Sequence, residues 1–308
     1  MRNAFGIALI ELKEDFPELV VLDGDNATST QTQLFSNRFP EAFLNVGIAE
    51  QNMVGIAAGL ALAELRPVAS AFASMLVNRA LDQITHAVAY QKLGVVLVGH
   101  YAGLSGGREG ACHHSISDIA ALRSVPNLSI VLPAADEDVL PLLRLAVQSG
   151  QPTYLRLSRQ SASRLPRPDR GSPMEGWCYW GNDEPEILIV TCGPIAAMAV
   201  DLQPELGANT GVLNIYRMKP FPDAGLWETT HRARAIVTVE EHSVVGGLGS
   251  MMSEWTAQHK PVVNVPLGIA DEFTVSGDHS ELLKLYGISP TNILNAVHLA
   301  VHRMERGR

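Results

Sequence analysis

Glu50 is the residue whose type and position most directly suggest chemistry. It opens a long, nearly all-apolar run in the string VGIAEQNMVGIAAGLAL, a pattern typical of a buried helix. A buried carboxylate costs free energy unless a charge or a hydrogen-bond donor compensates it. Glu50 therefore either stabilises the start of the helix, where the helix dipole favours an anion, or acts as a functional carboxylate. The residues alone leave both interpretations open.

A second candidate is the glycine-rich loop over 99–114, which follows a predicted strand and contains three histidines. Loops at the carboxyl ends of strands are where α/β proteins bind ligands. The adjacent His113 and His114 cannot easily share one metal ion, and no carboxylate spacing supports a metal site. We therefore expect no metal site in this loop.

The elements that must position these residues follow from the hydrophobic pattern. Short apolar strands alternate with helices through the first half of the chain, which predicts a doubly wound, mainly parallel α/β domain over 1–162. Strands are expected over 19–22, 42–46, 68–72, 95–98, 128–132 and 153–157, and helices over 4–13, 48–65, 78–90 and 136–149.

The alternation breaks over 163–182, where Pro, Arg, Ser and Gly are frequent, so we predict a linker there. The pattern then restarts and predicts a smaller α/β domain over 183–308. Its strands are expected over 187–190, 212–215, 236–239 and 262–265, and its helices from 196, near 251, and over 281–286 and 291–302.

Composition limits the classes of function. The 308 residues are 46% hydrophobic and 18% charged, enough for two domains of about 150 residues each. The net charge of -9 argues against nucleic acid or an anionic membrane as a partner. No signal peptide or membrane span is expected, and the odd, widely spaced Cys112, Cys178 and Cys192 argue against a disulfide framework. These features predict a cytoplasmic protein.

Several motifs in order give nearly the whole chain a resemblance to the transketolase family. The resemblance is to the pyrimidine-binding and C-terminal domains of transketolases and of the related deoxyxylulose-phosphate synthases. It implies a thiamine-diphosphate-binding fold followed by a transketolase C-terminal domain. The matching strings are FLNVGIAEQNMVGIAAGLAL, VASAF, HYAGLS, GREGACHH, SVPNLSIVLPAAD, RLSRQ, MKPFP and VEEHSVVGGLGS.

The resemblance implies a set of residues that bind thiamine diphosphate. Glu50 would bond to N1′ of the aminopyrimidine, and the shared proton favours the imino tautomer that activates the thiazolium carbon. Phe72 matches an aromatic position of the pyrimidine slot, and Asp25 matches an aspartate near the cofactor. Met75 stands where the family usually has a stacking phenylalanine, and sulfur–aromatic contact is a looser substitute. By residue type alone, Phe72 and Met75 would be ordinary core residues.

The resemblance also implies substrate contacts in the histidine loop. His113 would contact the substrate oxygen and the cofactor amine, a position suited to proton transfer, and His100 would contact the sugar phosphate. Glu109 stands where the family has an aspartate that reads the hydroxyl next to the carbonyl. Its extra methylene, the replacement of a glutamine by His114 and one extra loop residue predict an altered substrate preference.

Phosphate binding needs fixed cations and hydroxyls, and Arg2, Ser29 and Arg159 match the family positions that supply them. The string Leu22-Asp-Gly-Asp-Asn26 lacks the leading glycine of the G-D-G signature that binds Mg2+ and the diphosphate. We interpret it as a strand-end turn and expect no metal ligands in this chain.

These implications predict one subunit of a split transketolase. Because the chain opens at the pyrimidine domain, an N-terminal transketolase subunit is expected to carry the diphosphate domain and Mg2+ (or Ca2+), in an α2β2 heterotetramer. The implied reaction transfers a two-carbon ketol unit from a ketose phosphate to an aldose. A deoxyxylulose-phosphate-synthase-like or acyloin-forming enzyme acting on pyruvate, and a non-catalytic assembly or regulatory subunit, remain alternatives. The β chain of a 2-oxoacid dehydrogenase fits the motifs poorly.

Overall fold

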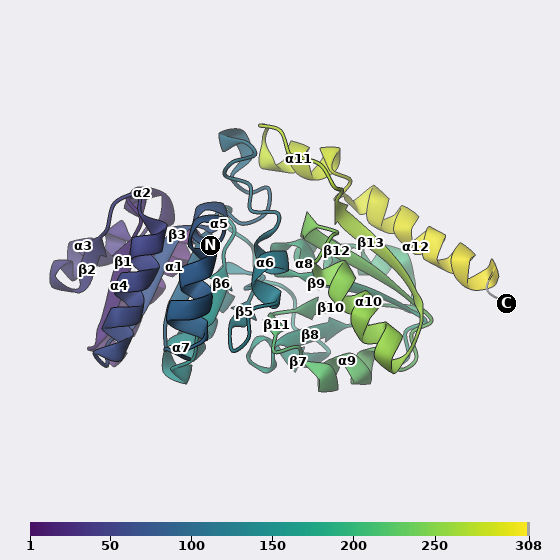
Figure 1. The fold of residues 1–308 in the computed structure, drawn as a ribbon. Helices are drawn as coiled ribbons and strands as arrows, with labels where there is room; N and C mark the ends of the chain where they lie inside the picture. The colour runs from purple at the N-terminus through teal and green to yellow at the C-terminus, as the bar shows by residue number, and fades with distance from the viewer. Residues whose placement is uncertain (307–308) are drawn as a thin grey trace.

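The computed structural model describes residues 1–306 and contains two sheets, seen side by side in Figure 1. The first sheet has the strand order β11-β5-β6-β4-β3-β1-β2, and only β11 runs antiparallel to its neighbour. This confirms the predicted parallel, doubly wound domain. Its strands are β1 (Leu19–Asp23), β2 (Phe43–Asn45), β3 (Arg66–Phe72), β4 (Val96–His100), β5 (Ser129–Val131), β6 (Thr153–Arg156) and β11 (Arg217–Lys219).

Helices alternate with these strands along the chain because the central strands β1, β3, β4 and β6 are buried on both faces of the sheet and must be covered. The helix predicted over 78–90 begins earlier, at Ala73, and ends in a π-helical segment over Ile84–Ala89. The α-helices of this unit are α1 (Arg2–Asp15), α2 (Ala27–Thr30), α3 (Gln33–Arg38), α4 (Glu50–Leu62), α5 (Ala73–Gln83), α6 (Asp118–Arg123) and α7 (Val139–Ser149).

The second sheet has the order β13-β12-β9-β10-β8-β7. The β10–β8 and β8–β7 pairs are antiparallel, and the other pairs are parallel. Its strands are β7 (Arg170–Ser172), β8 (Trp177–Trp180), β9 (Ile187–Cys192), β10 (Thr210–Ile215), β12 (Ala235–Ser243) and β13 (Val263–Ile269). Its helices are α8 (Ala196–Leu206), α9 (Asp223–Thr230), α10 (Leu248–His259), α11 (His279–Leu285) and α12 (Pro290–Arg306).

The structure corrects the linker predicted over 163–182, because β7 and β8 lie inside that range and belong to the second sheet. The four residues of β8, WCYW, are all buried, so their apolar surface outweighs the neighbouring turn residues. In addition, β11 follows the second domain's β10 in sequence yet pairs with β5 of the first sheet. A strand that follows the second unit's β10 in sequence thus forms one edge of the first sheet. Residues 307 and 308 of the predicted C-terminal domain lie outside the described residues.

The carboxyl ends of the parallel strands position the candidate residues. β1, β3 and β4 are neighbours in the first sheet and run in the same direction. The segments that follow them carry Asp25, Met75 and the histidine loop respectively. Residues distant in the sequence are therefore brought to one edge of the sheet, as expected for a parallel α/β fold.

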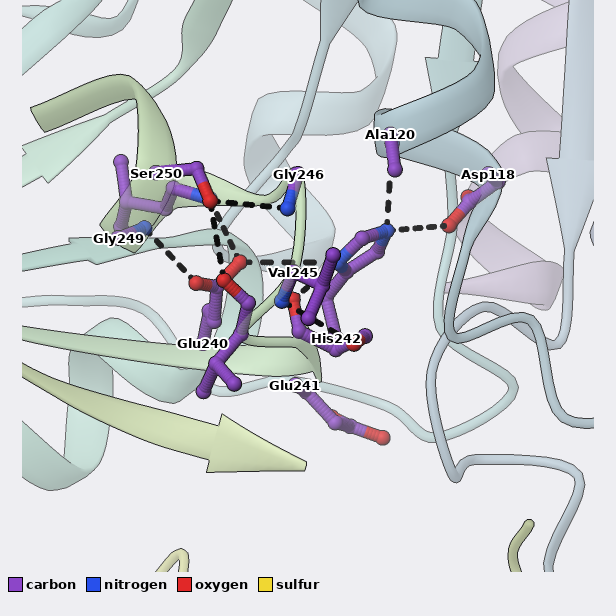
Figure 2. A network of polar contacts seen from close by, with 12 residues as sticks. Asp118, Ala120, Glu240, Glu241, His242, Val245, Gly246, Gly249 and Ser250 are labelled. Atoms are coloured by element: carbon purple, nitrogen blue, oxygen red, sulfur yellow. Dashed lines mark hydrogen bonds and ion pairs between the residues drawn. The ribbon is translucent and has the colours of Figure 1, made fainter. Parts of the chain in front are cut away.

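A buried polar network joins the two units. The Asp118 carboxylate accepts hydrogen bonds from Tyr154 Oη at 2.7 Å and from Arg156 Nε at 2.8 Å, and it lies 3.9 Å from His242 Nε2. Figure 2 shows this His242 contact together with Glu240, whose carboxylate accepts the backbone N–H of Gly249 at the start of α10. The first two backbone N–H groups of α10, those of Leu248 and Gly249, are therefore satisfied by the chain's own carboxylate.

Among residues 1–306, no helix combines the length and the apolar character needed to cross a membrane.

Candidate active site

Glu50 is the first residue of α4 and is only 4% exposed. Both of its carboxylate oxygens lie 2.9 Å from Nη1 of Arg79, a half-exposed residue of α5. This guanidinium supplies the compensating charge that a buried carboxylate needs. The two side chains line a cavity of about 540 Å³. Sequence reasoning missed Arg79, although its i, i+4 spacing from Met75 places both on one face of α5.

Phe72 lies at the centre of an aromatic cluster. It ends β3 and precedes α5, and its ring centroid is 4.5 Å from that of Tyr101 and 5.4 Å from that of His113, which meets it edge-on. Met75 follows on the first turn of α5 and is partly buried. The structure therefore brings Phe72 and His113 together and places Met75 on the adjoining helix.

His113 lies between a thiol and a carboxylate. Its Nδ1 is 3.2 Å from Cys112 Sγ, and its Nε2 is 3.8 Å from Glu109 Oε2. Ser74 Oγ of α5 donates to the Cys112 carbonyl at 3.0 Å, which ties this loop to the helix that follows Phe72. An imidazole in these surroundings can accept or release a proton.

Arg2 and Arg159 form a cation cluster around Tyr101. Their guanidinium carbons lie 5.7 and 5.2 Å from the Tyr101 ring centroid, and Arg2 Nη1 donates to Tyr101 Oη at 3.2 Å. Arg2 Nη1 also donates to the backbone carbonyl of Ser29 at 2.9 Å. A cavity of about 230 Å³ is lined by both arginines and by Asp136. Three predicted phosphate-binding residues thus lie together, with Ser29 contributing its carbonyl to the contact.

Sequence reasoning also missed Tyr101, the neighbour of His100, whose ring contacts both arginines. The His100 side chain is 0% exposed and packs edge-on against Phe5 at 4.9 Å between ring centroids. Burial, with smaller effects from the N-terminus and Arg2, lowers the pKa of His100 to about 3, so the ring is neutral. The one extra residue in this loop leaves open how His100 and Tyr101 align with the family motif. That open alignment is the sequence signal that could have pointed to Tyr101. The phosphate contact of His100 stays a prediction.

Asp25 makes its side-chain contact outside the aromatic cluster. It is exposed, adopts φ 66°, and accepts a hydrogen bond from Asn45 Nδ2 at 2.9 Å. The preceding Asp23 is buried and accepts from the backbone N–H of Asn26 at 2.7 Å, which closes the strand-end turn predicted there. Within residues 1–306, no three or more His, Cys, Asp or Glu side chains are grouped to hold a metal ion.

The family model for the transketolase pyrimidine binding domain matches residues 1–164, and the model for the transketolase C-terminal domain matches residues 180–293. The chain is 34% identical to a putative transketolase C-terminal section of Methanocaldococcus jannaschii, covering 96% of this chain and 95% of the relative. It is 32% identical to one subunit of an apulose-4-phosphate transketolase of Phocaeicola vulgatus, covering 95% and 94%.

A solved split gene transketolase, described as an inactive beta4 tetramer, superposes with a TM-score of 0.86 at 34% identity and covers 98% of both chains. A 1-deoxy-D-xylulose-5-phosphate synthase of Aquifex aeolicus is also 34% identical. That match covers 97% of this chain but only 48% of the relative.

Proposed function

The chain belongs to the transketolase family, and on this premise we propose that it is the C-terminal subunit of a split, thiamine-diphosphate-dependent transketolase. The observation that carries the proposal is the buried Glu50 carboxylate, which opens α4 at the wall of a cavity. Because the cavity lies directly beside Glu50, a bound ligand can reach the carboxylate. Two relatives of nearly the same length are named as a section or subunit of a transketolase.

The residues present fit the aminopyrimidine end of thiamine diphosphate. When bound, this cofactor supplies the electron sink for breaking a carbon–carbon bond. Glu50 would hold a proton against N1′, and Phe72 and Met75 would line the ring, with Asp25 near the cofactor. Arg79 contacts both Glu50 oxygens in this chain, so it must release or share the carboxylate when the pyrimidine binds.

The substrate end of the site would use the loop and the cation cluster. His113 would exchange a proton with the substrate oxygen, and Glu109 would contact a neighbouring hydroxyl. Arg2, Ser29 and Arg159 would bind the phosphate of a ketose phosphate, because two guanidiniums share one small cavity. The acceptor would be an aldose.

We propose that a separate N-terminal transketolase subunit carries the diphosphate-binding domain and Mg2+ (or Ca2+), in an α2β2 assembly. An exposed apolar face of α4, next to Glu50, supports a partner there. A Cβ added at Gly55 or at Gly59 would meet no atom within 4 Å, and Ile48 and Leu62 are 73% and 64% exposed. A related beta4 tetramer is described as inactive, which fits a site completed by another chain.

The test reconstitutes the chain with the N-terminal subunit, thiamine diphosphate and Mg2+. We expect ketol transfer from a ketose phosphate to an aldose, and none from either subunit alone. Release of CO2 from pyruvate would instead support the deoxyxylulose-phosphate-synthase-like or acyloin-forming alternative; such a synthase is 34% identical to this chain, as is the transketolase C-terminal section. If Glu50→Ala leaves the complex fully active, the chain is an assembly or regulatory subunit.

A further inference from the structure

A segment of the C-terminal domain lies against the substrate loop. Residues 270–278 connect β13 to α11, and Figure 1 shows α11 beside the loop that contains the one-turn helix η3 (Gly107–Glu109). The approach is close. A Cβ added at Gly110 would lie 2.6 Å from Ser276 Oγ, and one added at Gly107 would lie 3.2 Å from the Gly277 carbonyl oxygen. Both glycines also have positive φ, so the contact excludes larger residues on two grounds.

The central contact of this interface runs from Thr274 through His114 to Gly107. Thr274 Oγ1 is 2.7 Å from His114 Nδ1, and His114 Nε2 is 3.0 Å from the Gly107 carbonyl oxygen. A carbonyl only accepts hydrogen bonds, so Nε2 carries the proton and donates. Burial lowers the pKa of His114, so the ring is neutral and Nδ1 must accept from the Thr274 hydroxyl. The Gly107 carbonyl therefore fixes the tautomer of His114, and the Thr274 hydroxyl holds the ring in its orientation.

Two further contacts tie the same domain to the loop. Glu241 Oε1 accepts from the Leu104 backbone N–H at 2.7 Å and from His279 Nε2 at 2.9 Å, and this carboxylate is buried. Arg108 and Asp278 form a two-pronged pair with N–O distances of 2.9 and 3.1 Å, but both side chains are exposed and such pairs contribute little. The loop that carries Glu109 and His113 is thus fixed by buried groups of the second domain.

We propose that the C-terminal domain holds the substrate loop in its binding conformation, with Thr274 as a positioning residue that acts through His114. The inference rests on the proposed function for the role of Glu109 and His113. Without the hydroxyl, His114 Nδ1 has no donor, and the loop populates its ordered conformation less often. Apparent substrate affinity then falls with the ordered fraction, whereas the saturated complex recovers the ordered loop.

The kinetic test uses the reconstituted complex with Thr274→Val. We expect KM for the ketose phosphate to rise about tenfold while kcat stays within about twofold, and Thr274→Ser to restore KM because it keeps the donor. Thr256→Val is the matched control. Thr256 is 4% exposed against 6% for Thr274, and its hydroxyl donates to the Met252 carbonyl inside α10. Equal KM values for Thr274→Val and Thr256→Val overturn the proposal.

A second readout does not depend on the proposed function. Amide hydrogen exchange over residues 103–114, measured on the chain itself, should accelerate about tenfold in Thr274→Val and in the smaller Thr274→Ala, but not in Thr256→Val. Unchanged exchange in both Thr274 variants overturns the positioning role even if the complex is active. If exchange accelerates in the chain but the reconstituted complex shows no ketol transfer, the positioning role is supported and only the proposed function is contradicted.

Discussion

At the scale of single residues, Glu50 has a partner in this chain and another in the proposed complex. Arg79 neutralises the carboxylate here, and its own side chain is half-exposed at the cavity wall. An exposed, flexible partner is easier to displace than a buried one, because its guanidinium can be hydrated after it leaves. In the proposed complex, Arg79 would therefore leave the Glu50 carboxylate when the cofactor binds.

Replacing Glu50 by Gln should lower kcat of the reconstituted enzyme by about 100-fold or more, since an amide cannot share a proton with N1′ as a carboxylate does. Steady-state ketol transfer measures the loss. Glu64→Gln, at the exposed Glu64, is the matched control and should keep normal activity. A Glu50→Gln enzyme within about threefold of wild type would contradict the catalytic role.

Replacing Arg79 by Met should lower the free energy of unfolding by about 1–2 kcal/mol, because Glu50 then lacks its charged partner. Urea denaturation of the chain measures this. In the double variant Glu50→Gln, Arg79→Met, the two losses should not add, since the amide carries no charge to compensate. Additive losses would show that the two side chains do not interact in solution.

Tyr101 contacts both arginines, so its hydroxyl should affect phosphate binding. Tyr101→Phe removes the group 3.2 Å from Arg2 Nη1 and should raise KM for phosphorylated donors about threefold to tenfold, with little change for unphosphorylated ones. Tyr90→Phe, at an exposed tyrosine, serves as the control. Equal effects on both donor classes would argue against a phosphate site here.

At the scale of elements, α4 has two faces with different surroundings. One face packs Met53, Val54 and Ala57 into the core, and the other leaves Gly55 and Gly59 open. A helix with this much exposed apolar and glycine surface is unusual unless another chain covers it. Because Glu50 starts the same helix, a partner bound on this face would lie directly beside the cofactor site.

Gly55→Leu should therefore weaken binding of the N-terminal subunit at least about tenfold without lowering the stability of the chain alone. Open space at the Cβ position leaves room for the new side chain in the isolated chain, whereas a closely packed partner would clash with it. Sedimentation of subunit mixtures measures the association, and a melting curve checks the fold. Glu11→Leu on α1 is the control, and normal assembly of Gly55→Leu would refute this interface.

At the scale of the whole molecule, titratable groups buried in the core make the free energy of unfolding depend on pH. Burial lowers the pKa of His242, in the network between the units, to about 4 and that of His100 to about 3. Below pH 6.5 these histidines bind protons in the unfolded chain but stay neutral in the folded one. Their contribution to the free energy of unfolding is therefore lost as the pH falls. Burial raises the pKa of Glu240 to about 7, so its contribution has the opposite sign and declines as the pH rises from 4.5 to 7.

The free energy of unfolding should rise less steeply between pH 4.5 and 6.5 in His100→Leu. The slope should fall by roughly 1.4 kcal/mol per pH unit, which corresponds to one proton fewer taken up on unfolding. The substitution is apolar and His100 has no hydrogen-bond partner for its ring nitrogens among the described residues. Urea denaturation at several pH values measures the slope. An unchanged slope would show that His100 is protonated or exposed in solution, and a raised KM for phosphorylated donors would support its predicted phosphate contact.

The sequence by itself determined the local features of this protein. The apolar run that follows Glu50 predicted α4, and the alternation of apolar strands with helices predicted both α/β units, because hydrophobic periodicity is a property of consecutive residues. The turn after β1 followed from its Asp, Gly and Asn residues in the same way. These features need no contact between distant parts of the chain.

Only the tertiary structure decided which neighbour faces the site and which distant segments support it. His100 points into the core and Tyr101 toward the arginines, a choice made by packing around β4 rather than by residue type. Likewise, Arg79 meets Glu50, β11 joins the first sheet, and Thr274 reaches His114 across 160 residues. Such contacts depend on the close packing of elements distant in sequence, which no local pattern records.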